Sequence, residues 1–160
     1  MFKEIKEVRY ASYILPIRIK NGKKQVAITE FKQHEYGKIG GRFEDNETDA
    51  RQALRREIIE ELNPGAEVMA NTAIKIPEPY CVNNTDPEFI KIRLARKEIR
   101  YMFVAQIPPD MEIVFCEQSA DNDHIVWIDA ESLLDENIIK HSDERAYIEK
   151  HIMPIIRNIK

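Results

Sequence analysis

The chain has 160 residues, of which 43% are hydrophobic and 32% are charged, and its formal net charge is −4 at pH 7. This composition is typical of a soluble globular protein, and the length suits a single domain that spans residues 1–160. The acidic balance argues against a general nucleic-acid binder. No apolar run reaches the roughly 20 residues that a membrane-spanning helix requires, and the N-terminus has no signal-peptide core, so we expect a cytoplasmic protein.

Two strands joined by a tight hairpin are expected at the start of the chain. The segment from Val8 to Ile19 is strand-like, and a second strand-like run extends from Gln25 to Phe31. Between them lies Asn21-Gly22, a dipeptide that suits a type I′ turn because both turn positions need a positive φ. We therefore predict an antiparallel pair of strands here.

The segment from Gly40 to Gly65 is the most informative stretch of the sequence. An apolar residue recurs there every four positions, which predicts an amphipathic helix with one buried stripe, formed by Leu54, Ile58 and Leu62. Asp49 is placed to cap the start of this helix. Asn63, which tolerates a left-handed conformation, and Pro64, which cannot continue a helix, mark its end.

Three glutamates share one face of that helix. Glu57, Glu60 and Glu61 are spaced at i, i+3 and i+4, so like charges repel by about 0.2–0.5 kcal/mol per pair even in solvent. The adjacent Arg55 and Arg56 point to other sides, which makes them poor neutralisers of the whole set. A hard divalent cation such as Mg²⁺ prefers oxygen ligands and matches the set better. The alternative interpretation is an ordinary solvated helix face.

The rest of the chain supplies further strands and helices, and two candidate substrate contacts. The expected strands span residues 66–76, 98–107, 112–116 and 125–128. The expected helices span residues 86–95, 129–134 and 143–156, the last of them interrupted by Pro154. Tyr80 either stacks on a nucleobase or belongs to the core. Arg100 ends a basic stretch that either steers phosphate or forms a solvated face.

The residues from Gly41 to Glu61 resemble the signature of the Nudix hydrolases, the MutT-like family. In that signature a glycine is followed after five residues by a glutamate, and after seven more by Arg-Glu, an aliphatic residue, any residue, Glu-Glu, any residue, a glycine and an aliphatic residue. Gly41, Glu47 and the run from Arg56 to Glu61 occupy these positions as far as Glu-Glu. Asn63 and Pro64 replace the closing glycine and aliphatic residue. Eight residues separate Glu47 from Arg56, so one residue is inserted in the loop or the first helical turn, which leaves the role of Glu47 open.

The resemblance implies an α/β fold with a mixed sheet between helices, an α/β/α sandwich, and an enzyme that hydrolyses phosphoanhydrides with Mg²⁺, for which Mn²⁺ can substitute. It implies that Glu57, Glu60 and Glu61 hold the metal with help from the Gly41 carbonyl, and that Arg56 orients a carboxylate of this catalytic set. A carboxylate of the same helix or of a later loop would act as general base. The candidates in that loop are Glu117, Asp121 and Asp123.

A nucleoside diphosphate linked to another moiety, such as ADP-ribose, is the first candidate substrate. Pro79 lies about where ADP-ribose pyrophosphatases of the family carry a proline, and Gly41, Tyr80 and Arg100 are the expected contacts of this small nucleotide-type substrate. A nucleoside triphosphate pyrophosphohydrolase, a non-catalytic nucleotide-binding module and a partner-binding domain with a charged helix remain alternatives. A homodimer is compatible with the apolar N-terminal strands.

Overall fold

A mixed β-sheet forms the centre of the protein. The computed structural model describes residues 3–32, 34–85, 92–116 and 123–160. Within these residues the sheet has eight strands: β1 (Lys3–Lys20), β2 (Lys23–Phe31), β3 (Glu35–Gly37), β4 (Ile39–Arg42), β5 (Ile74–Lys75), β6 (Tyr80–Thr85), β7 (Ile92–Gln106) and β8 (His124–Asp129). The main path through the sheet is β3-β2-β1-β7-β5, with β4 paired to β1, β6 to β7 and β8 to β2.

The two longest strands, β1 and β7, run parallel and side by side at the middle of the sheet. The other pairings described are antiparallel. The β1–β2 hairpin turns at Asn21 (φ 53°) and Gly22 (φ 77°), which confirms the predicted turn with two positive φ values. The sheet is therefore mixed, as expected.

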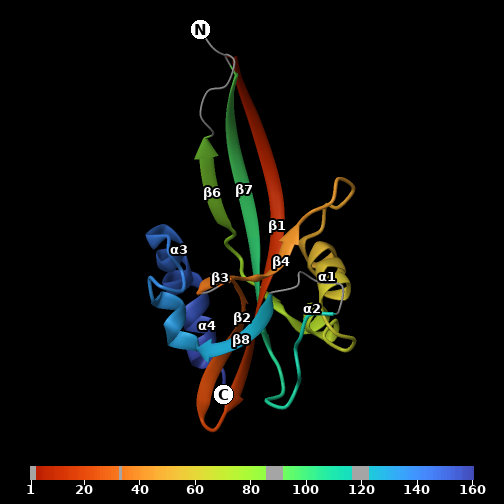
Figure 1. The fold of residues 1–160 in the computed structure, drawn as a ribbon, viewed down its shortest axis with the longest axis vertical. Helices are drawn as coiled ribbons and strands as arrows, with labels where there is room; N and C mark the ends of the chain where they lie inside the picture. The colour runs from red at the N-terminus through yellow and green to blue at the C-terminus, as the bar shows by residue number, and fades with distance from the viewer. Residues whose placement is uncertain (1–2, 33, 86–91, 117–122) are drawn as a thin grey trace.

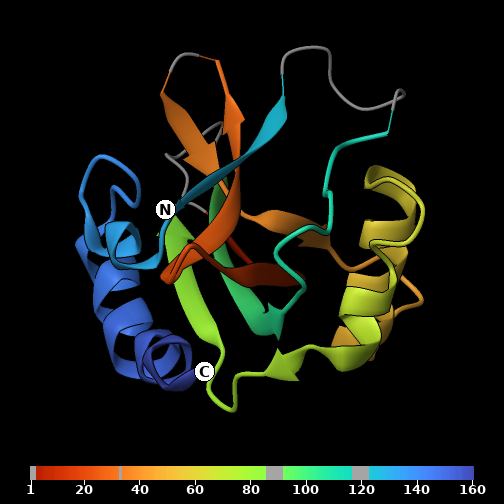
Figure 2. The ribbon, with the colours of Figure 1, turned by 90° about the horizontal axis from the view of Figure 1, so that it is seen from below.

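Helices cover both faces of the sheet (Figures 1 and 2). One face carries α1 (Ala50–Glu61) and α2 (Val68–Thr72). The other face carries the 3₁₀-helix η1 (Ala130–Leu134) and the C-terminal helical segment, in which the order is α3 (Ser142–Tyr147), the π-helical turn η2 (Ile148–Ile152) and α4 (Met153–Asn158). This arrangement confirms the α/β/α sandwich. None of the helices in the described ranges has the length and apolar character to cross a bilayer.

Two apolar clusters fill the space between the sheet and its helices. Neighbouring residues of β1 contribute to opposite clusters, because successive side chains of a strand point to opposite faces. On the α1 face the buried cluster includes Ile14, Leu54, Ile58 and Phe103. On the C-terminal face it includes Leu15, Ile17, Val104, Ile148 and Ile152. The predicted central strand over residues 98–107 is thus confirmed within β7, with both faces covered.

Three of the expected elements are wrong. Residues 66–76 form α2 and the two-residue strand β5 instead of one strand. Residues 112–116 make only an isolated bridge, between Phe115 and Leu62. The helix expected over residues 86–95 is contradicted at its end, since residues 92–95 belong to β7, while residues 86–91 lie outside the described part. Local patterns do not report the tertiary contacts that decide whether such short apolar segments become helix, strand or loop.

The C-terminal helical segment accommodates Pro154 without ending there. The π-helical turn Ile148–Ile152 directly precedes Met153 and Pro154, and Pro154 occupies the first turn of α4. Proline lacks a backbone N–H and its ring clashes with the carbonyl four residues earlier in a regular helix. A wider turn relieves that clash. The interruption of the C-terminal helix predicted at Pro154 is therefore a single wider, π-helical turn just before the proline.

Candidate active site

Polar contacts fix the N-terminal end of α1. The Asp49 side chain accepts hydrogen bonds from the backbone N–H groups of Arg51 (2.8 Å) and Gln52 (3.0 Å), which confirms the predicted cap. Ser12 of β1, fully buried, donates its hydroxyl to the carbonyl oxygen of Ala50 at 2.7 Å. The helix is thus attached to the strand that pairs with β4, and its position relative to the paired glycines of β4 is set.

The two glycines of β4 serve different purposes. A Cβ atom on Gly41 would come within 2.5 Å of Glu57 Oε1, so the Glu57 carboxylate occupies the space that a side chain would fill. Gly40 has a φ of 141°, and a Cβ atom there would come within 2.1 Å of the Ser12 carbonyl oxygen. Gly40 is required by the backbone, whereas Gly41 lets the first glutamate of the set approach β4.

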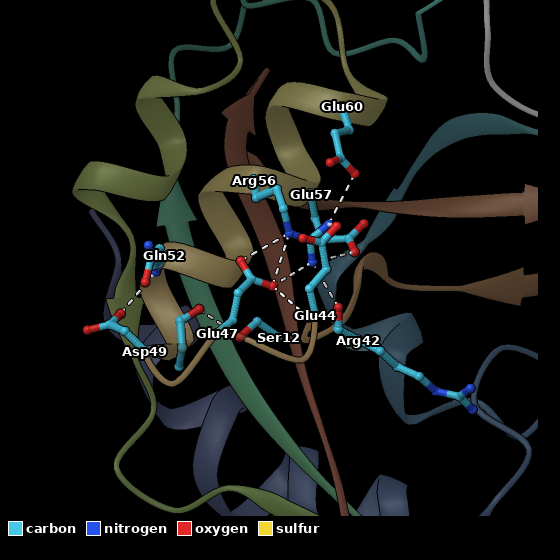
Figure 3. Close-up of polar contacts among 10 residues, drawn as sticks. Ser12, Arg42, Glu44, Glu47, Asp49, Gln52, Arg56, Glu57 and Glu60 are labelled. Atoms are coloured by element: carbon cyan, nitrogen blue, oxygen red, sulfur yellow. Dashed lines mark hydrogen bonds and ion pairs between the residues drawn. The ribbon is translucent and has the colours of Figure 1, made fainter.

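Arg56 connects the carboxylates of this region (Figure 3). Its guanidinium contacts Glu47 through Nε (3.0 Å) and Nη2 (2.9 Å), Glu57 through Nη2 (3.1 Å) and Glu60 through Nη1 (3.1 Å). Nη2 also donates to the carbonyl oxygen of Arg42 at 2.9 Å. The expectation that Arg56 points away from the glutamates is wrong for Glu57 and Glu60, because the guanidinium fork reaches several acceptors at once.

Glu47 keeps a defined role despite the inserted residue. The connection between β4 and α1 absorbs the extra residue, since α1 is regular from Ala50 onward. The side-chain hydrogen bond from Arg56 lowers the pKa of Glu47, and the Glu47 carboxylate also accepts a hydrogen bond from the Glu44 backbone N–H at 2.8 Å. Glu47 therefore holds Arg56 in place.

Glu61 and Glu57 form an acidic pair. Burial, the negative charge of Glu57 and a side-chain hydrogen bond with Glu57 raise the pKa of Glu61 from 4.5 to about 7. At neutral pH a proton is therefore partly retained between two carboxylates that would otherwise repel. A position where two carboxylates share a proton is one that a cation can occupy instead.

Glu60 lies near this pair, and its negative charge also raises the pKa of Glu61. The Glu60 side chain is 53% exposed and contacts Arg56 (Figure 3). Within the described residues, no three His, Cys, Asp or Glu side chains are arranged to hold a metal ion. The donor set nonetheless fits Mg²⁺, because Glu57 and Glu61 offer hard oxygen donors beside Gly41 and the exposed Glu60 is free of packing that would prevent its rotation toward them. Metal binding by these residues stays a prediction.

Tyr80 and Arg100 are opposite each other in the β6–β7 register. Tyr80 is only 7% exposed, and its ring stacks on Tyr147 with centroids 5.3 Å apart, which favours the core alternative for this residue. The Arg100 side chain is 26% exposed, with Nε at 2.7 Å from Glu98 and Nη1 at 3.7 Å from Glu144. Substrate contact by either residue stays a prediction.

A charged network that was not predicted lies on the C-terminal face of the sheet. Glu98 and Glu144 are each 7% exposed, and both contact Arg100. Lys38 Nζ lies 2.5 Å from Glu144, and Arg42 Nε lies 3.6 Å from Glu98. Glu98 and Arg100, spaced at i and i+2 at the start of an apolar run, were the available signal, because that spacing puts both side chains on one face of a strand.

The C-terminal end of α1 differs from the expectation. Asn63 is not left-handed; the helix passes into extended backbone at Leu62, and the left-handed residue is Gly65, with a φ of 98°. Asn63 instead accepts a hydrogen bond from the Val114 N–H (3.1 Å) and donates one to the Glu112 carbonyl (3.1 Å). These bonds hold the segment before the later loop against the end of α1.

The later-loop candidates for the general base are only partly described. Glu117 and Asp121 lie outside the described residues. Asp123 directly precedes β8, next to His124, whose Nε2 lies 2.8 Å from Glu30. Their role as general base stays a prediction.

Neither family models nor curated protein sequences match the chain. Solved structures do. An Ap4A hydrolase from C. elegans has a TM-score of 0.60 at 14% identity, with 94% of this chain and 99% of that chain covered. A MutT protein from Bacillus halodurans has a TM-score of 0.57 at 13% identity, with 91% and 82% covered. The chain has the Nudix fold.

A third neighbour is longer than this chain. It is a bifunctional NMN adenylyltransferase/ADP ribose pyrophosphatase from Francisella tularensis, complexed with AMP and a manganese ion, with a TM-score of 0.53 at 19% identity. The match covers 89% of this chain and 41% of that one. The Nudix fold therefore accounts for nearly the whole of this chain, and α1 is the helix that carries the residues resembling the Nudix signature.

Proposed function

We propose that the protein is a Nudix hydrolase that cleaves a phosphoanhydride bond in a nucleotide with the help of Mg²⁺. The observation that carries the proposal is the acidic pair of Glu57 and Glu61 beside Gly41, on the helix where the Nudix signature places its metal ligands. A purely structural helix face gains nothing from burying two carboxylates against each other. A metal site explains why they are kept together.

Glu57, Glu60 and Glu61 would hold the metal, and the Gly41 carbonyl would add an oxygen ligand. When bound, Mg²⁺ neutralises charge on the phosphate oxygens and acidifies water, and Mn²⁺ can do the same. Arg56 keeps the Glu57 carboxylate oriented through its bonds to Glu47 and Glu57. The residues at hand therefore suit the group that the fold implies.

The hydrolysis itself needs a base and a receptive phosphate. A carboxylate, either in the glutamate set or in the later loop, takes a proton from the attacking water. The water oxygen bonds to phosphorus, the anhydride P–O bond breaks, and two phosphate-bearing products leave. Arg100 is paired with Glu98 and Glu144 on the face of the sheet opposite α1, so its predicted contact with the substrate takes no part in this step.

A nucleoside diphosphate linked to another moiety, such as ADP-ribose, is the proposed substrate. The Francisella tularensis neighbour, named as an ADP ribose pyrophosphatase and complexed with AMP and manganese, supports this choice. Nucleoside triphosphates, the alternative substrates, belong in the same test, and the neighbour named as an Ap4A hydrolase is the reason to include dinucleoside polyphosphates.

The test is product release from a panel of ADP-ribose, nucleoside diphosphate sugars, dinucleoside polyphosphates and nucleoside triphosphates, with Mg²⁺ or Mn²⁺. We expect metal-dependent turnover that falls by about 10²-fold or more in Glu60→Gln and Glu61→Gln, because each removes a carboxylate ligand of the metal that neutralises the transition-state charge. Glu136→Gln, an exposed carboxylate after η1, is the matched control. No turnover of any compound by the wild type would refute the proposal and favour a binding module.

A further inference from the structure

A cavity of about 490 Å³ lies between β1 and the connection from β4 to α1. Figure 1 shows this connection beside β1, near the point where β1 extends past β4. One wall is formed by β1 residues from Glu7 to Tyr10, and the other by residues from Arg42 to Glu47. The volume lies in the range of small-molecule sites. The functional roles assigned above use only the residues at one end of this cavity.

Aromatic rings form one side of the cavity. Tyr10 stacks on Tyr101 with ring centroids 6.4 Å apart and contacts the Phe43 ring at 5.7 Å. Phe43 in turn stacks on Tyr101 at 6.0 Å. Tyr10 nevertheless remains 41% exposed, although burial of a tyrosine ring is favourable. A supported ring that stays open to solvent is a platform on which a flat aromatic ligand can stack.

The strand edge beside that platform offers backbone groups. Among the described residues, the first hydrogen bond on this edge of β1 is from the Phe43 N–H to the Tyr10 carbonyl oxygen, at 2.8 Å. Pairing with β4 continues from there toward Ile14, so the edge before Tyr10 is unpaired in the described part of the chain. Alternate residues of a strand direct their N–H and C=O groups to the same edge. The backbone donor and acceptor of Val8 therefore point into the cavity, and the Val8 side chain is 52% exposed.

Carboxylates outnumber cations in the lining. Glu7, Glu44, Asp45 and Glu47 lie there with only Arg9 and Arg42 as positive side chains. Glu7 is paired with Arg9 (2.6 Å) and Glu47 with Arg56 (2.9 Å), so the lining has no excess of cations that would attract a phosphate. Its remaining carboxylates can accept hydrogen bonds from N–H groups, since an ionised carboxylate is an acceptor only. The ligand part that fits is neutral, aromatic and rich in N–H donors.

The cavity is continuous with the glutamate set. Glu47, which lines it, is 2.9 Å from Arg56 Nη2, and the same nitrogen is 3.1 Å from Glu57 Oε1. One guanidinium therefore separates the cavity from the proposed metal ligands. A nucleotide whose phosphates lie at Glu57 can place its base within reach of Tyr10.

We propose that this cavity is the nucleobase subsite of the hydrolase, and that it selects adenine. The ring stacks on Tyr10. The amino group and the adjacent ring nitrogen, a donor beside an acceptor, match the C=O and N–H of Val8, with a lining carboxylate accepting the second amino hydrogen. This inference rests on the proposed function, which it deepens by naming the base.

The test is the affinity for AMP, which has no anhydride to cleave, measured by calorimetry with Mg²⁺. Tyr10→Ala should weaken AMP binding about 10-fold, within the range of alanine substitutions under stacked bases, whereas Tyr10→Phe should keep the affinity. Val68→Ala on α2, which removes another exposed apolar side chain, is the control. Inosine monophosphate should bind several-fold more weakly than AMP, and ribose 5-phosphate should not respond to Tyr10→Ala.

Three results would overturn the subsite: no measurable AMP binding to the wild type, equal AMP affinity in Tyr10→Ala, or equal affinity for AMP and inosine monophosphate. The proposed function fails separately. If AMP binds through Tyr10 but no compound is hydrolysed, the subsite stands and the hydrolase falls. If hydrolysis is metal-dependent and Tyr10→Ala leaves the AMP affinity unchanged, the proposed hydrolase function is supported and the proposed subsite is refuted.

Discussion

At the Glu57–Glu61 pair, a proton and the proposed metal ion would compete for one position. The pKa of Glu61 is about 7 in the native protein and 4.5 as the ordinary value, so between these pH values the unfolded chain releases a proton that the native state retains. Without metal, stability should therefore fall as pH rises from about 4.5 to about 7. Metal affinity should rise over the same window, because the metal binds the deprotonated pair.

The variant Glu61→Gln separates these two effects. It should be more stable than the wild type at pH 8 without metal, with a flatter pH dependence, because it cannot acquire the buried charge. Urea denaturation at pH 5 and pH 8 measures this, with Glu136→Gln as the control. If the stability of Glu61→Gln and of the wild type depends on pH in the same way, the Glu57–Glu61 pair does not cause the predicted loss of stability.

The neighbouring glycines should respond differently to alanine. In Gly41→Ala the new Cβ displaces the Glu57 carboxylate, so hydrolysis should fall by about 10-fold or more while the protein stays folded. In Gly40→Ala the new Cβ meets the Ser12 carbonyl and φ is unfavourable, so stability itself should fall, by about 1–3 kcal/mol. Activity assays and thermal unfolding of both variants check this. Equal loss of stability in the two would contradict the division of roles.

Single residues were predicted well where one local rule decided them. The Asp49 cap and the Asn21-Gly22 turn follow from side-chain and backbone chemistry within four residues. The same kind of rule gave the wrong conformation for Asn63, because the Asn63 side chain hydrogen-bonds to the backbone of the distant residues Glu112 and Val114. Contacts with segments far along the chain are invisible to a rule that reads neighbours.

Among the elements, α1 has an N-terminal cap whose contribution to stability can be measured. Asp49→Ala should lower stability by about 1 kcal/mol, because two N–H groups at the helix start lose their acceptor, whereas Asp49→Asn should keep most of it. Chemical denaturation of the two variants provides the comparison. If both lose the same stability, the cap is not what the side chain contributes.

Periodicity predicted the elements that have a clear buried stripe. The α1 stripe and the two-faced apolar run of β7 were recognised because covering layers leave a regular pattern. Residues 66–76 were read as a strand, but Met69 and Ala70 are buried within α2 and only Ile74–Lys75 pair with β7. Short apolar segments do not distinguish helix from strand, and their partners decide.

At the scale of the molecule, the sheet brings together residues that the sequence keeps apart. Ser12 from β1, Gly41 from β4 and Glu57 from α1 meet because β4 pairs with β1 and α1 packs on the same face. The signature named Gly41 and Glu57, but neither Ser12 nor the Tyr10 platform has a sequence signal. The site was therefore predictable at the signature residues of α1 and β4, and not on β1.

The most direct test of whether the carboxylates of α1 form a metal site is a Mn²⁺ binding titration, in which electron paramagnetic resonance measures the free Mn²⁺ that remains. A metal site on α1 predicts that wild type and Glu136→Gln bind Mn²⁺ equally and that Glu57→Gln loses at least about 10-fold in Mn²⁺ affinity. It also predicts that Mn²⁺ binding by the wild type weakens as pH falls below about 7. Equal binding by wild type and Glu57→Gln would contradict it, because the carboxylates of α1 would then not form a metal site.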